Sequence, residues 1–254
     1  MITKLFYFIL TLLFSSSVFA VYLTEDSEAR GMAISVMNQQ YSKESYVEKY
    51  HCWLVNDEEN THCLAIQRAD TVYVEGKQRL FILISNITDV SIDGVLYGHP
   101  STGVLAAFLL EKEEDGSWSY KASSKIIQSG GSMGETGAFD ARFVELGVNY
   151  YGWIFSQGYY QQGYQKFDYV ILGVKDNEFV NLVDKLPASC GKPKPQIELE
   201  YKIQIVNKNK NSQIYPIKLN EFKADKMTNS YTVGFNYAKW KYNQTKAYCE
   251  SFEF

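Results

Sequence analysis

Short apolar and aromatic runs with the two-residue period of β-strands dominate the chain after residue 50. Residues 197–205 alternate strictly between apolar and polar side chains, which is typical of a strand with one buried face, and residues 231–240 alternate again. Further β-branched and aromatic runs cover residues 50–55, 61–67, 72–74, 80–85, 104–110, 118–122, 139–146, 151–155, 167–174 and 179–183. Turn signals separate the runs. The pattern predicts a mainly β protein: an antiparallel sandwich, barrel or meander of about a dozen strands.

One stretch before these runs has the features of a helix. In residues 24–40, Thr24 can cap the first turn, acidic residues follow it, and Met32, Val36 and Met37 supply apolar positions. Gly31 lowers the helix propensity of this stretch. We expect one N-terminal helix, without the helix–strand alternation of a parallel α/β enzyme.

The first twenty residues have the three regions of a secretory signal peptide. Lys4 supplies the positive charge, residues 5–14 form the apolar stretch, and Val18 and Ala20 occupy the −3 and −1 positions of a cleavage site. The apolar stretch is shorter than the roughly 20 residues of a transmembrane helix. The sequence therefore predicts cleavage after Ala20, export, and a mature chain with no transmembrane helix.

Charge divides the chain into an acidic body and a basic tail. Removal of Lys4 with the leader leaves 24 Lys and Arg against 29 Asp and Glu, a mature net charge of −5, which argues against nucleic acid as a partner. Residues 190–254 hold eleven Lys and six acidic residues, whereas residues 21–189 hold 13 Lys and Arg and 23 acidic residues. We expect a main β domain over residues 21–189 and a basic β subdomain over residues 190–254.

An even number of cysteines in an exported chain favours disulfides over metal thiolates. The four are Cys52, Cys63, Cys190 and Cys249, and three pairings are possible. Residues 50–55 and 61–67 look like the two strands of a hairpin, and if Val55 faces Asn60, the first two cysteines face each other in the same register. The other two would then pair and bracket the basic subdomain.

The dipeptides His51-Cys52 and His62-Cys63 also look like pairs of metal ligands. Side chains alternate along a strand, so we expect both histidines on the face opposite the sulfur atoms. No third ligand follows nearby, although zinc sites use three or four. We therefore expect no metal and no other cofactor.

Residues 130–134 match G-x-S-x-G, the nucleophile elbow of α/β hydrolases, with Ser132 as the nucleophile. That elbow needs a helix after it and a later histidine, whereas His51, His62 and His99 all precede Ser132. We expect a flexible glycine-rich loop instead. The acidic cluster Glu111, Glu113, Glu114 and Asp115 is expected to form a solvated turn. A hydrolase based on carboxylates stays an alternative, because sequence does not fix the distances between acidic residues.

Tyrosine, glycine and glutamine are concentrated between residues 146 and 168. Tyr159, Tyr160 and Tyr164 are framed by glycines, so we expect them on an exposed loop that contacts a partner, with Tyr150 and Tyr151 as further binding candidates. The pattern of Leu-Gly, Gly-Trp and Gly-Tyr pairs in this stretch resembles a group of bacterial exported proteins of unknown function. That resemblance implies a periplasmic location and carries no catalytic residue to this chain.

These features together predict a periplasmic, non-enzymatic binding protein. Its partner would be another protein of the envelope, most specifically a toxin enzyme that this chain neutralises as an immunity protein or inhibitor. The alternatives are an envelope hydrolase that uses carboxylates or Ser132, and a carbohydrate-binding module that uses the tyrosine-rich segment.

Overall fold

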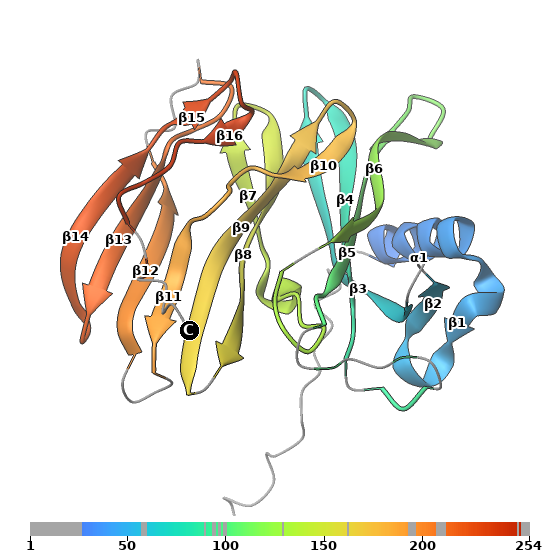
Figure 1. Cartoon of the computed structure of the whole chain (residues 1–254). Helices are drawn as coiled ribbons and strands as arrows, with labels where there is room; N and C mark the ends of the chain where they lie inside the picture. Colours follow the sequence, from blue (N-terminus) through green and yellow to red (C-terminus); the bar gives the residue numbers. More distant parts are fainter. Residues whose placement is uncertain are drawn as a thin grey trace, which may run out of the picture.

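The computed structural model describes residues 27–249, apart from residues 57–59, 89, 93–94, 96–97, 99–100, 129, 162, 193–196, 207–211 and 248. The chain forms two antiparallel sheets that pack face to face, with one helix on the outer face of the first sheet (Figure 1). The predicted mainly β fold with one N-terminal helix is confirmed. The predicted leader and the capping residue Thr24 lie outside the described residues.

The helix α1 (Ser27–Tyr41) covers one face of the first sheet. Its buried residues, Ala29, Ala33, Val36 and Met37, recur at intervals of three and four, so they form one stripe along the helix. Small alanines at two of these positions let the helix approach the sheet closely. The helix is followed by two 3-10 turns, η1 (Lys43–Ser45) and η2 (Glu48–Tyr50).

The first sheet is a meander whose six strands pair in chain order. They are β1 (Tyr46–Val47), β2 (Cys52–Asn56), β3 (Thr61–Val74), β4 (Lys77–Asn86), β5 (Val104–Lys112) and β6 (Trp118–Gln128). Its inner strands are apolar on both faces because both are covered. In β4, Ile82 and Ile84 contact the layer of α1, whereas Phe81 and Leu83 contact the second sheet.

The second sheet follows the 3-10 turn η3 (Ala138–Asp140) and has the order β14-β13-β12-β11-β9-β8-β7, with β10 paired to β9. Its strands are β7 (Arg142–Gly147), β8 (Tyr150–Gln161), β9 (Tyr164–Lys175), β10 (Glu178–Asn181), β11 (Pro187–Gly191), β12 (Ile197–Ile205), β13 (Ile217–Lys223) and β14 (Lys226–Val233). A small hairpin, β15 (Phe235–Asn236) and β16 (Lys241–Tyr242), follows. The segment after Cys190 thus continues the sheet that β7, β8 and β9 begin.

The two predicted disulfides are both present. Cys52 joins Cys63, and Cys190 joins Cys249, with Cα–Cα distances of 5.4 and 5.9 Å. The register predicted for the first pair is wrong by two residues, because Val55 pairs with His62 rather than with Asn60. The strands are paired from Asn56 and Thr61 onward, so their connection is residues 57–60 rather than 56–59. A shift of two residues keeps every side chain on its predicted face, so the sulfur atoms still meet.

A buried carboxylate on the first sheet is bonded to a tryptophan of the second sheet. The Asp70 carboxylate on β3 accepts hydrogen bonds from Arg68 Nε and Nη2 at 2.9 and 2.6 Å, and from Trp153 Nε1 on β8 at 3.0 Å. Trp153 is completely buried, and Asp70 is only 6% exposed. The bond to Trp153 helps to fix where β8 lies over β3, since the buried indole needs an acceptor and Asp70 supplies it.

We predict that Asp70→Ala lowers the free energy of unfolding by about 3 kcal/mol, because it leaves the Arg68 guanidinium and the buried Trp153 indole without their acceptor. Asp70→Asn keeps one acceptor oxygen and should cost less. Urea unfolding followed by tryptophan fluorescence measures the change. Asp140→Ala, at an exposed carboxylate, is the control and should change stability by under about 0.5 kcal/mol. Equal effects of Asp70→Ala and the control would contradict the prediction.

Candidate functional site

The tyrosine-rich segment is a β-hairpin rather than the predicted loop. Tyr159 and Tyr160 belong to β8 and Tyr164 to β9, and the pairing of these strands continues to their last residues. Gly158, which suggested a loop, lies within β8, where a Cβ atom would come 2.0 Å from the carbonyl oxygen of Lys166. The glycine is therefore required by close approach of two strands and does not mark a turn.

Strand alternation divides the three tyrosines between the two faces of the hairpin. Tyr159 and Tyr164 lie on one face and Tyr160 on the other, because Tyr159 pairs with Lys166 and Tyr160 with Gln165. The rings of Tyr160 and Phe167 pack in a T-shaped arrangement with their centroids 5.4 Å apart. Tyr159 and Tyr160 are 40% and 51% exposed. The predicted exposure of these two side chains is therefore found, but the single aromatic tip is not.

The other two binding candidates, Tyr150 and Tyr151, lie at the opposite end of β8. The Tyr150 hydroxyl donates to the carbonyl oxygen of Val174 at 2.7 Å, and its ring packs against the core. Tyr151 stacks on Phe143 with 5.7 Å between ring centroids and 16° between planes. The structure does not bring these two side chains to the exposed end of the hairpin, and both have packing roles.

The glycine-rich residues 130–137 run along the distal half of β8. The amide of Gly130 donates to Gln157 Oε1 at 3.1 Å, and Asn86 Nδ2 on β4 donates to the carbonyl oxygen of Gly134 at 2.7 Å. Gly137 has φ 72°, and a Cβ atom there would come 1.8 Å from the carbonyl oxygen of Ser156. Contacts to both sheets thus hold this segment in place, in contrast to the flexible loop expected from its sequence.

Two exposed apolar side chains in this region were missed by the sequence analysis. Met133 is 52% exposed, and Phe139 on η3 is 69% exposed. Met133 was considered only within the G-x-S-x-G pattern, and Phe139 was assigned to a strand, although β7 begins three residues later. The preceding Gly137 was the available signal of a turn. We define the β8 flank as Met133, Phe139, Tyr159 and Tyr160. They come from residues 130–140 and from β8, which are in contact at Gly130 and Gln157, and the two tyrosines leave β8 on its opposite faces.

The structure does not provide the surroundings that a nucleophile elbow needs. After residues 130–134 the chain forms only the short 3-10 turn η3 and then β7, where an α-helix would be required. Met133, with φ 56°, has the left-handed backbone conformation, whereas Ser132 does not. His62 lies in β3, and His99 lies outside the described residues.

The acidic cluster begins within β5, where Glu111 is a buried carboxylate, instead of forming a fully solvated turn. Glu111 Oε1 accepts from Lys77 Nζ at 2.9 Å, and its Oε2 accepts from Arg79 Nε at 2.8 Å. These hydrogen bonds, that of Lys77 foremost, lower the pKa of Glu111 to about 2. Bonds from Ser119 and then Lys121 likewise lower the pKa of Glu113. A general acid needs the opposite shift, so these two carboxylates are poor candidates for that role.

Asp168 on β9 has the opposite environment. Burial raises the pKa of its carboxyl group, although two nearby lysines act to lower it. Asp168 pairs with Gln157, so alternation places it on the same face of the hairpin as Tyr159, Lys166 and Tyr164. An aromatic surface beside a carboxylate and an amide is an arrangement that can bind a sugar ring.

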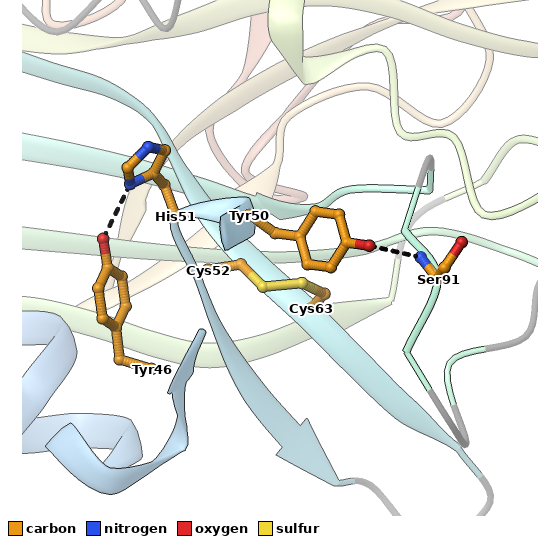
Figure 2. The surroundings of a disulfide bond; sticks show 6 residues. All are labelled: Tyr46, Tyr50, His51, Cys52, Cys63 and Ser91. Atoms are coloured by element: carbon orange, nitrogen blue, oxygen red, sulfur yellow. Dashed lines mark hydrogen bonds between the residues drawn. A yellow bond between two sulfur atoms is a disulfide. The ribbon is translucent and has the colours of Figure 1, made fainter. Parts of the chain in front are cut away.

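The surroundings of the first disulfide separate His51 from the two sulfur atoms. Figure 2 shows His51 turned away from the sulfur atoms, with its Nδ1 atom 3.1 Å from the Tyr46 hydroxyl. On the other side, the amide of Ser91 donates to the Tyr50 hydroxyl at 3.1 Å. The sulfur atoms of Cys52 and Cys63 are bonded to each other. In the described part of the chain, no group of three or more His, Cys, Asp or Glu could hold a metal ion.

Comparison with known proteins supplies no relative: no protein-family model, curated protein or solved structure matches the chain. Over the residues that the structure describes, none of the helices has the length and apolar character needed to cross a membrane.

We predict that ionised Glu111 stabilises the fold in a pH-dependent way. Its pKa is lower in the folded chain than its ordinary value of 4.5, so the stabilisation is complete above about pH 4.5 and is lost as the pH falls towards about 2. Glu111→Gln should lower the melting temperature at pH 7 and flatten the decline between pH 4.5 and 2.

Thermal melts between pH 7 and pH 2 test this prediction. Glu114→Gln, at an exposed position on the same turn, is the matched control and should keep the wild-type profile. A wild-type profile for Glu111→Gln as well would show that the Lys77 and Arg79 bonds contribute nothing to stability.

Proposed function

We propose that this chain is an exported, non-enzymatic binding protein whose partner is another protein of the bacterial envelope. The observation that carries the proposal is the β8 flank, where three aromatic side chains and one methionine are exposed on two neighbouring segments. Aromatic residues and methionine are enriched at protein interfaces and supply much of the binding energy there. Such side chains gain nothing from water contact, so a covering partner accounts for their exposure.

The backbone beneath the flank is held firmly enough to act as a preformed surface. Tyr159 and Tyr160 extend from a hairpin whose strands pair to their ends. The segment that carries Met133 is fixed by the bonds from Asn86 and to Gln157. A surface of this kind loses little conformational entropy when a partner binds, which favours affinity.

Export and the immunity role rest on further observations. Two disulfides among the described residues are consistent with an oxidising compartment, and the sequence before them predicts a cleavable leader. An inhibitor needs a rigid complementary surface and no catalytic groups of its own. We therefore propose neutralisation of an envelope-acting toxin enzyme as the most specific form of this function.

A carbohydrate-binding role is the second candidate, and the face formed by Tyr159, Tyr164 and Asp168 favours it. The two candidates share Tyr159 but differ in their other residues, because Phe139 and Tyr160 do not belong to that face. Binding of purified peptidoglycan that is lost in Tyr164→Ser but kept in Phe139→Ser would favour the sugar. Envelope-protein binding with the reverse sensitivity would favour the protein partner.

We predict that the double variant Phe139→Ser/Tyr160→Ser binds its envelope partner more than tenfold more weakly than the wild type, as expected for interface aromatics worth roughly 2 kcal/mol each. Quantitative affinity capture from envelope extract, followed by titration of the captured protein, measures the loss. Tyr73→Ser/Met227→Ser is the control, because these two side chains are together at least as exposed as Phe139 and Tyr160 but lie outside the β8 flank.

Thermal melts of both variants complete this experiment. The proposal requires unchanged melting temperatures together with a loss confined to the first variant. A folded Phe139→Ser/Tyr160→Ser protein that keeps wild-type affinity would exclude the β8 flank as the binding surface. Equal loss in the control would show a nonspecific effect of removing surface apolar groups.

We predict that the mature protein isolated from the periplasm begins at Val21 and has no free thiol, because the sequence predicts a cleavable leader and the two disulfides are consistent with an oxidising compartment. Intact-mass measurement with and without an alkylating reagent tests both points. A retained leader, or alkylation of four cysteines without reduction, would contradict the proposed location.

A further inference from the structure

The ends of the two sheets differ in how their backbone edges are covered. At the β6 end of the first sheet, Ser123 donates its amide proton to the carbonyl oxygen of Asn177 at 3.0 Å. At the β7 end of the second sheet, Tyr215 donates to the carbonyl oxygen of Leu146 at 2.7 Å. The β1 edge is only two residues long and lies between two 3-10 turns. The β6 and β7 edges are thus protected by segments from elsewhere in the fold, and the β1 edge is protected by its short length.

The fourth end, β14, lacks such cover among the residues that the structure describes. Residues 226–230 and 232 are exposed, so both faces of this eight-residue strand contact water as well as its outer edge. The strand is nevertheless well ordered by its inner neighbour. Glu221 on β13 accepts from Thr228 Oγ1 and Asn229 Nδ2, each at 2.7 Å, and from the Tyr231 hydroxyl at 3.1 Å.

Two features that oppose edge pairing, a lysine and a bulge, are confined to the first three residues of β14. It has no proline, and its only charged residue, Lys226, is at its start. A bulge at Thr228, where the register to β13 shifts, leaves residues 229–233 as a regular and uncharged edge. An edge of this composition is suited to pair with another strand.

We propose that β14 is a self-association edge, which pairs antiparallel with β14 of a second copy of this chain about a two-fold axis at Tyr231. This register places Asn229 opposite Val233 and Ser230 opposite Thr232 of the other copy, so no like charges meet. The lysine-bearing turns before β14 then lie at opposite ends of the paired strands, roughly 30 Å apart at about 3.4 Å per residue. That separation exceeds the Debye length of about 8 Å, so the positive ends do not repel.

A second copy suits this edge better than an unrelated strand, because the two-fold arrangement makes one short polar segment complementary to itself. The paired edges are too small for a standard interface of roughly 800 Å² per partner. The dimer is therefore reversible and its population rises with protein concentration. This association is independent of the β8 flank.

A charge exchange across the two-fold axis tests the proposal. Ser230→Lys/Thr232→Lys places two lysines opposite each other at each of two symmetric positions, and Ser230→Glu/Thr232→Glu does the same with carboxylates. Each variant alone should dimerise at least tenfold more weakly than the wild type in sedimentation velocity, over roughly 10 to 500 μM protein. An equimolar mixture of the two variants should recover the dimer, since opposite charges then meet.

Two matched measurements keep the result decisive. Ser230→Ala/Thr232→Ala, which adds no charge, should keep the wild-type dimer, and amide exchange of residues 229–233 should slow as wild-type concentration rises. A wild-type chain that stays monomeric at every concentration overturns the proposal. A dimer that persists in both charged variants, or a mixture that fails to recover it, also overturns the proposal.

Discussion

The carboxylate of Asp70 is the constraint on which the relation between the two sheets depends. It lies in the apolar layer between them and accepts from Arg68 within its own sheet and from Trp153 in the other. Apolar side chains alone would tolerate a sliding of one sheet over the other, because dispersion and burial have little direction. The hydrogen bond between the sheets opposes that sliding, since sliding would leave the buried indole of Trp153 without its acceptor.

The position of the β8 flank follows from this fixed alignment. The distal half of β8 extends beyond β7, which pairs only with residues 150–154 of that strand. Residues 130–137 occupy the space beside it, and they reach it from β6 of the first sheet. Asn86 on the first sheet and Gln157 on the second bond to this segment together only while the sheets keep their alignment. The segment that carries exposed apolar side chains is therefore held by hydrogen bonds from polar side chains of both sheets.

Strand periodicity and cysteine chemistry were sufficient to predict the fold class, the helix and both disulfides. The pairing of Cys52 with Cys63 survived an error in register, because a shift of two residues preserves the face of every side chain. The binding residues were harder to predict. A glycine such as Gly158 is equally compatible with a loop and with a crowded strand. Only the structure distinguishes the two, because a Cβ atom at this position would come 2.0 Å from the carbonyl oxygen of Lys166. Burial of Glu111 likewise depends on Lys77 and Arg79, which are far away in sequence.

The edges and the faces of the two sheets differ in how much of them is exposed. The inner strands of the first sheet are buried on both faces, and β8 and β9 of the second sheet have a core on each side. Along β12 only one face is buried, and Lys202 and Gln204 are exposed on the other. Long strands such as β8 extend past their neighbours and expose side chains there without weakening the core. Strands that are covered on both faces can gain a binding surface in this way at little cost in stability.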